Sequence, residues 1–103
     1  MADKNRELRS ERMRLANLKG THTKKEWQEL RDFFNVCVRC NGESGYSSLG
    51  KDHIIPIYQG GSNSIKNLQP LCPFCNASKG PENIDHRILF AKKHNITLKP
   101  EWL

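Results

Sequence analysis

The sequence predicts an α+β fold that is stapled by a zinc site and flanked by helices. Three observations carry this prediction: helix formers dominate the first third of the chain, the helical period is lost from Asn35 onward, and the four cysteines form two close pairs. With 103 residues, of which 36% are hydrophobic, the chain has the length of one domain with a small core. Such domains usually need a staple, because backbone ordering costs about as much free energy as so little apolar burial returns.

The composition indicates a basic protein with a polyanionic partner, although many small basic proteins bind nothing negative. Seventeen Lys and Arg residues against eleven Asp and Glu residues give a net charge of +6 at pH 7. No apolar run approaches the roughly 18 residues that a membrane span requires. The charged N-terminus also lacks the apolar region of a signal peptide. We therefore expect no membrane partner and a cytoplasmic location, where thiols stay reduced.

A basic helix is expected over residues 4–19, with a break at Gly20. Its apolar stripe is thin, so residues 1–20 are interpreted as a helix or arm outside a domain that spans residues 21–103. A solvated charged helix and a nucleic-acid contact fit this pattern equally well. Contacts with DNA would be salt-dependent and sequence-tolerant, because they would reach phosphates. The candidate DNA-binding side chains are Arg6, Arg9, Arg12 and Arg14.

A second helix is expected to begin after Thr23, which forms a capping box with Glu26. Trp27, Leu30 and Phe34 then fall on one face at helical spacing, which predicts packing against the core. Stacking of these aromatic side chains on bases is the sharper alternative. We interpret them as core residues, because the spacing is that of an amphipathic helix.

The rest of the chain predicts a hairpin followed by two short helices, with Trp102 capping the core. Pro56 is expected to stop the first strand, because proline donates no ladder hydrogen bond. The expected elements are a strand over 49–57, a loop over 60–64, a second strand over 67–71, a helix that opens over 76–79, and a last helix over about 84–94.

The four cysteines form two Cys-x-x-Cys pairs with thirty-one residues between them. Two residues between ligands let one tight turn present both sulfurs to a tetrahedral Zn²⁺ ion at about 2.3 Å. A redox dithiol or a disulfide is the alternative. A closed shell of four thiolates leaves no position for water, so the zinc should hold the fold and not perform chemistry. The predicted zinc ligands are Cys37, Cys40, Cys72 and Cys75.

A carboxylate and an imidazole are neighbours between the two cysteine pairs. Asp52 offers a ligand for a hard cation, and the imidazole of His53 suits general-base chemistry at neutral pH. Adjacent residues on a regular strand face opposite sides, so both can serve one site only where the strand twists or ends. Pro56 favours such an end. Taken alone, the Asp-His pair is a weak signal.

The pair belongs to a longer array with a specific order and spacing. The array consists of Asp52-His53-Ile54-Ile55-Pro56, Gly60-Gly61, Asn67-Leu68-Gln69-Pro70-Leu71-Cys72, and Cys75-Asn76 followed by Lys79-Gly80. Over residues 37–80 it resembles the HNH endonuclease family, particularly its small, zinc-stapled phage members, and residues 21–34 resemble the lead-in helix of such proteins. The resemblance implies a ββα-metal finger, which is a hairpin plus a helix that begins near Asn76.

The resemblance also implies site residues for a metal-dependent DNA endonuclease. His53, Asn67 and Asn76 stand at the family's first His, middle Asn and last His; the last position departs from the pattern, and its amide oxygen favours Mg²⁺ or Mn²⁺. By this resemblance Asp52 and Asn76 would hold one divalent ion, and His53 would act as general base. Asn67 would fix the loop and orient His53. Lys79 is a candidate contact for the phosphate backbone.

Double-stranded DNA is therefore the expected partner, cut with low sequence specificity. The resemblance further suggests a phage or prophage protein in a bacterial or phage-infected cytoplasm, acting beside a terminase or other packaging proteins. The alternative is a noncatalytic zinc module that binds nucleic acid or a packaging partner through its basic helix. A pure binding module has no reason to keep a carboxylate among basic residues at a phosphate-facing site, and this discriminates between the two.

Overall fold

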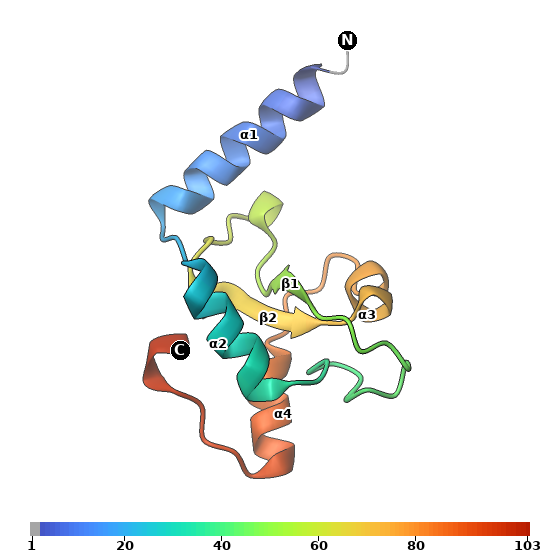
Figure 1. Cartoon of the computed structure of the whole chain (residues 1–103). Helices are drawn as coiled ribbons and strands as arrows, with labels where there is room; N and C mark the ends of the chain where they lie inside the picture. Colours follow the sequence, from blue (N-terminus) through green and yellow to red (C-terminus); the bar gives the residue numbers. More distant parts are fainter. Residues whose placement is uncertain (1–2) are drawn as a thin grey trace.

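A two-stranded antiparallel hairpin lies at the centre of the fold, and helices pack around it (Figure 1). The computed structural model describes residues 3–103, with side chains from residue 8 onward. The helices are α1 (Asp3–Leu18), α2 (Lys24–Phe34), α3 (Pro73–Ser78) and α4 (His86–His94), and the strands are β1 (Gly50–His53) and β2 (Leu68–Leu71). This arrangement confirms an α+β fold in which a hairpin precedes a short helix, as in a ββα-metal finger.

Helix α2 forms one wall of the core, and its N-terminus has the predicted capping box. The Thr23 hydroxyl accepts a hydrogen bond from the Glu26 amide at 3.0 Å, and the Glu26 carboxylate accepts one from the Thr23 amide at 2.8 Å. Trp27, Leu30 and Phe34 are buried as predicted. Full burial of such a side chain contributes about 2 kcal/mol, so this face anchors α2.

Strand β2 is buried along its whole length, and β1 covers one of its edges. The register pairs Asp52 with Gln69 and His53 with Leu68. The predicted first strand, 49–57, is too long, because β1 ends at His53. After β1 the backbone donates its hydrogen bonds to Asn67 and no longer to β2. The Ile54 amide donates to the Asn67 carbonyl oxygen, and the Ile55 amide donates to the Asn67 side-chain oxygen.

The two C-terminal helices begin at residues other than those predicted. Helix α3 begins at Pro73, with Cys72 as N-cap, so Asn76 lies inside the helix and not at its start. Proline favours the first helical turn, where its missing N–H costs nothing. Helix α4 begins at His86, because the Asp85 side chain accepts a hydrogen bond from the amide two residues later. Trp102 is buried and packs edge-on against an aromatic ring of α2, as a core cap should.

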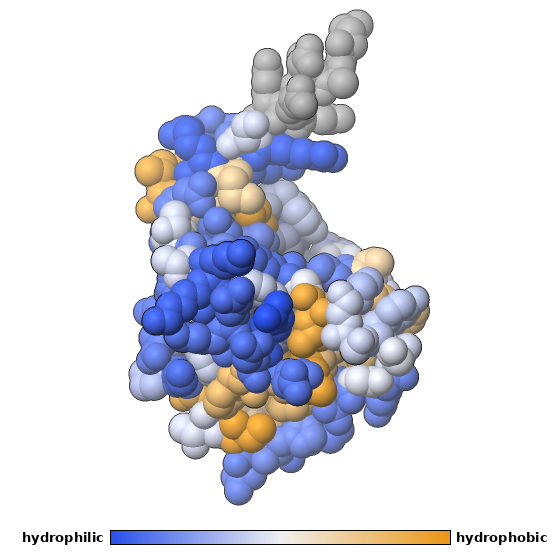
Figure 2. Space-filling model, in the orientation of Figure 1, coloured by the Kyte–Doolittle hydropathy of each residue, from blue (hydrophilic) through white to orange (hydrophobic). Residues whose placement is uncertain are grey.

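Helix α1 extends away from the rest of the molecule (Figure 1). Its last turn meets the body, where Ala16 is buried. Figure 2 shows a largely hydrophilic surface over α1 and α2, with small hydrophobic patches between. Arg6 lies outside the residues whose side chains are described. Within the described part of the chain, no helix has both the length and the apolar character needed to cross a membrane.

Candidate functional site

The four cysteines come together as predicted. Their sulfur atoms all lie within 4.8 Å of one another. A tetrahedral zinc ion with Zn–S bonds of about 2.3 Å would place the sulfurs about 3.8 Å apart, so the cluster fits this ion. Cys40 and Cys72 lie 3.9 Å apart, and the Ser44 hydroxyl lies within hydrogen-bonding distance of both sulfurs. The donor set and its burial fit a structural zinc ion, which would join the loop after α2 to the start of α3.

The thiols of this cluster differ in their tendency to ionise. Burial raises the pKa of Cys75 to about 12. The pKa of Cys40 is lowered to about 6. Burial alone would raise it, but hydrogen bonds from Ser44 outweigh the effect of burial. Without a cation, therefore, the four sulfurs do not all become thiolates at neutral pH. A bound zinc ion supplies the positive charge that allows this.

A second site lies beside α3, in a cavity of about 260 Å³. Asp52 and His53 reach it from the end of β1, and Asn76 reaches it from α3. Because β1 ends at His53, the two neighbours line the same cavity although residues within a strand face opposite sides. The structure thus brings together the three side chains to which the sequence assigned the divalent ion and the general base. Tyr58, from the turn after β1, also lines the cavity.

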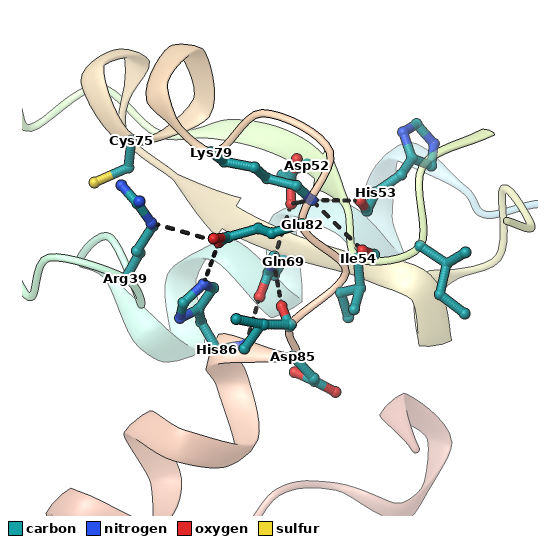
Figure 3. A network of polar contacts seen from close by, with 12 residues as sticks. Arg39, Asp52, His53, Ile54, Gln69, Cys75, Lys79, Glu82, Asp85 and His86 are labelled. Carbon is teal, nitrogen blue, oxygen red and sulfur yellow. Dashed lines mark hydrogen bonds and ion pairs between the residues drawn. The ribbon is translucent and has the colours of Figure 1, made fainter. Parts of the chain in front are cut away.

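Lys79, a candidate contact for the phosphate backbone, is bonded within the protein in this structure. Its ammonium is buried and donates to Asp52 Oδ2 at 2.6 Å and to the His53 carbonyl oxygen at 2.8 Å (Figure 3). The Ile54 carbonyl oxygen lies 3.5 Å away. A lysine that follows α3 directly points back under the end of β1, where these oxygens converge. Its charge therefore compensates Asp52 at the wall of the cavity, which Lys79 also lines.

Gln69 is a site residue that the sequence analysis missed. Its amide donates to Asp52 Oδ2 at 2.9 Å, and its oxygen accepts from the His86 amide at 2.9 Å. The side chain therefore ties the carboxylate to the first turn of α4 (Figure 3). The register of the hairpin would have indicated this contact, since Gln69 stands directly opposite Asp52 in the antiparallel pair.

Asn67 holds the loop that follows β1. Its buried amide accepts from the Ile55 amide at 2.9 Å and donates to the carbonyl oxygens of Ile55 and Ser62 at 3.0 and 2.8 Å. The approach is so close that a Cβ atom at Gly61 would clash with the Ile55 carbonyl. None of these contacts reaches His53, so the direct orienting role expected of Asn67 is not what its hydrogen bonds provide.

His53 is held by Asn63, a second residue that the sequence analysis missed. The Asn63 side-chain oxygen lies 2.9 Å from His53 Nε2. An amide oxygen only accepts hydrogen bonds, so Nε2 carries the proton and Nδ1 keeps its lone pair. The glycine- and serine-rich loop showed no motif at this position, because its partner lies ten residues away on β1.

One segment of the chain matches a known family. It contains both cysteine pairs together with Asp52, His53 and Asn76 from the cavity. Residues 36–82 match the family model of the HNH endonuclease. This matching segment, residues 36–82, is called the HNH domain after the family model that it matches. Neither the curated proteins nor the solved structures gave a match to the chain.

Helices α1, α2 and α4 lie outside the residues that match the family model. Helices α1 and α2 precede the match, and α4 follows it. A half-buried network nonetheless links α4 to the zinc side of the HNH domain: the Glu82 carboxylate lies 2.7 Å from His86 Nε2 and 3.5 Å from Arg39 Nε (Figure 3). The hydrogen bond with His86 lowers the pKa of Glu82 below its usual value.

Three of the predicted DNA-binding arginines have described side chains, and all three are exposed: Arg9, Arg12 and Arg14. Arg14 forms a salt bridge with Glu11 one turn earlier. Arg9 and Arg12 line a groove of about 390 Å³ together with Met13, Ile57 and Tyr58. The last two residues also line the cavity of the HNH domain, so the groove and the cavity adjoin.

Proposed function

We propose that the chain is a metal-dependent DNA endonuclease that hydrolyses phosphodiester bonds. Membership of residues 36–82 in the HNH endonuclease family supports this reaction class. The single observation that carries the proposal is the shared cavity of Asp52, His53 and Asn76. A general base and two hard oxygen ligands in one open cavity are what phosphodiester hydrolysis requires.

His53 acts as the general base. Its Nε2–H donates a hydrogen bond to the Asn63 side-chain oxygen, so Nδ1 is free to take a proton from water as that water attacks phosphorus in line. The attacking water becomes part of the product phosphate, and the leaving oxygen takes a proton from solvent. No covalent enzyme intermediate is needed, because the nucleophile is water.

Asp52 and Asn76 are the residues that hold a divalent ion in this proposal. In the described part of the chain, both hydrogen bonds to the Asp52 carboxylate fall on Oδ2, which leaves Oδ1 for a cation. A carboxylate and an amide oxygen are hard donors that fit Mg²⁺ or Mn²⁺. When bound, such an ion supplies Lewis-acid stabilisation of the charge that develops on phosphate and leaving oxygen.

Lys79 makes the carboxylate a weak cation ligand in the absence of substrate. Its ammonium already compensates Asp52, so a divalent cation meets less than a full negative charge. A substrate phosphate adds the missing negative charge. We therefore infer that ion and DNA bind cooperatively, each more tightly in the presence of the other.

Double-stranded DNA reaches the cavity along the groove beside α1. Arg9 and Arg12 flank this groove, and Tyr58 lies between it and the cavity. Arginines on an exposed helix contact phosphates without reading base sequence. Low sequence specificity follows from this arrangement.

A second candidate, a noncatalytic zinc module that binds nucleic acid, is favoured by one observation. The ion pair between Lys79 and Asp52 neutralises the carboxylate that an endonuclease needs for its cation. The two functions are separated by supercoiled plasmid incubated with the protein and Mg²⁺, Mn²⁺ or a chelator. Nicked or linear plasmid that depends on the divalent ion supports the endonuclease, whereas retarded but uncut plasmid contradicts it.

His53→Ala is the matched variant for this assay. We expect it to keep its fold and its DNA affinity while losing cleavage, because only the proton acceptor is removed. Circular dichroism and a gel-shift titration establish that the variant is folded and still binds. Cleavage at the wild-type rate would remove His53 from the mechanism.

A further inference from the structure

We propose that Ser44 is a positioning residue of the cysteine cluster: its hydroxyl donates to the thiolates of Cys40 and Cys72 and so holds the zinc ion more tightly. The inference rests on zinc binding by the cluster and is independent of the proposed nuclease activity. It assigns a share of the metal affinity to a side chain that is not a ligand, because the hydrogen-bond partners of ligands tune how strongly they bind a metal.

The Ser44 hydroxyl lies between the two cysteine pairs. Its oxygen is 3.3 Å from the sulfur of Cys40, in the first pair, and 3.1 Å from the sulfur of Cys72, in the second pair. These two sulfurs are 3.9 Å apart, which matches the spacing of about 3.8 Å between ligands of a tetrahedral zinc ion. The hydroxyl therefore bridges the two pairs while their sulfurs hold positions that suit the ion.

The direction of these hydrogen bonds follows from the charge of the sulfurs. A cysteine sulfur that binds zinc is a thiolate, which accepts hydrogen bonds and donates none. The Tyr46 amide donates to the Ser44 oxygen at 3.4 Å, so one lone pair of that oxygen is occupied and the hydroxyl proton is left for the sulfurs. Whichever of the two sulfurs the proton faces, it stabilises negative charge on a zinc ligand.

The cluster needs such a donor because its charge is not balanced. Four thiolates carry twice the charge of one Zn²⁺ ion, so the loaded cluster keeps an excess of negative charge. Three of the four cysteines are buried, whereas Cys40 is partly exposed. Water and competing chelators therefore reach the cluster at Cys40 first, and Ser44 places its hydroxyl at this sulfur.

A tight turn after Cys40 brings Ser44 back to the cluster. Asn41 and Gly42 both adopt left-handed backbone conformations, with φ of 54° and 83°, so the chain reverses within a few residues. The Glu43 amide closes this turn by donating to the Cys40 carbonyl oxygen at 3.0 Å. The position of the hydroxyl is thus fixed by the backbone next to the ligand and does not depend on a distant element.

Three variants of the full chain test this role. Ser44→Ala removes the hydroxyl, Ser44→Thr keeps it, and Ser48→Ala is the matched control, because it removes an exposed hydroxyl from the same loop. Zinc affinity is measured by competition with a chelator of known affinity, and circular dichroism at saturating zinc checks that each variant is folded. We expect an affinity about tenfold lower for Ser44→Ala, the size of effect that hydrogen-bond partners of metal ligands have. Ser44→Thr and Ser48→Ala should bind zinc as the wild type does.

Selective alkylation separates a lost donor from a loosened loop. A hydrogen bond draws charge from a thiolate and lowers its reactivity toward an electrophile. The zinc-loaded wild type and Ser44→Ala are treated with iodoacetamide, and the modified cysteine is identified by mass spectrometry in chains that carry a single label. We expect Ser44→Ala to accelerate labelling of Cys40, while Cys37 and Cys75 react as slowly as in the wild type. Equal acceleration at all four cysteines would assign the effect to loosening and contradict the inference.

The remaining outcomes each decide the role of Ser44. Wild-type zinc affinity in Ser44→Ala would overturn the inference and leave the zinc site itself intact. A Ser44→Thr variant that binds zinc as weakly as Ser44→Ala would also overturn it, because the hydroxyl would then not be the group that matters. A wild type that binds no zinc would overturn the inference together with the zinc site. Both measurements are made without DNA, so their results do not depend on nuclease activity.

Discussion

Lys79 Nζ lies 2.6 Å from Oδ2 of Asp52, and both side chains are more than nine-tenths buried, with 4% and 8% exposed. Burying two charges is costly unless each finds a partner. Here the ammonium also meets two backbone carbonyl oxygens, and the carboxylate also meets an amide. The pair thus joins the end of β1 to the end of α3 and fixes one wall of the candidate catalytic cavity.

Removing the ammonium should destabilise the fold strongly. For Lys79→Met we expect a loss of about 3 kcal/mol in the free energy of unfolding, because Asp52 is left as a buried, uncompensated charge. In a domain of this size the melting temperature should fall by about 15 °C, measured by circular dichroism. The double variant Asp52→Asn with Lys79→Met carries neither charge and should be more stable than Lys79→Met alone. A single variant as stable as the wild type would show that the pair contributes nothing.

The same substitution should strengthen binding of a divalent cation. Without the neighbouring ammonium, Asp52 presents its full negative charge, so the affinity for Mn²⁺ should rise about tenfold or more at low ionic strength. Isothermal titration of the folded variant with Mn²⁺, without DNA and at a temperature below its melting transition, measures this change. Asp52→Asn is the control, because it removes the carboxylate and should bind less tightly than the wild type. Equal affinities for Lys79→Met and wild type would place the ion away from Asp52.

Loss of zinc should unfold the domain. Cys72 is fully buried and joins β2 to α3, so Cys72→Ser should lower the melting temperature by about 20 °C or abolish the transition. Chelation of the wild type should have the same effect, reversed by added zinc and accompanied by release of one zinc ion per chain. A thermal transition that is indifferent to both treatments would refute the structural role of the cluster.

DNA affinity should depend on two arginines of α1 and much less on a third. Arg9→Ala and Arg12→Ala should each weaken binding to all sequences alike and reduce the slope of log affinity against log salt by about 1. Arg14→Ala is the matched control, because its guanidinium is already paired with Glu11. Gel-shift titrations at several salt concentrations give the slopes. Equal losses for all three arginines would show that the groove beside Tyr58 is not the DNA path.

Local patterns accounted for much of the fold. Thr23 and Glu26 bond to each other three residues apart, and the apolar face of α2 follows from the spacing of its own residues. The approach of the two sulfurs within each cysteine pair was likewise predictable, since each pair occupies a single turn. Strand and helix ends were less predictable, because Pro73 and Asp85 set the starts of α3 and α4 through contacts that compete with hydrophobic periodicity.

The sequence by itself determined that a zinc cluster, a carboxylate, an imidazole and an amide belong to one small α+β domain. Only the tertiary structure decided which groups these side chains touch. Asn63, and not Asn67, meets His53, and Lys79 turns inward to Asp52 across a separation of 27 residues. The physical reason is that hairpin register and loop closure choose such partners, whereas a sequence pattern reports only neighbours within one or two turns.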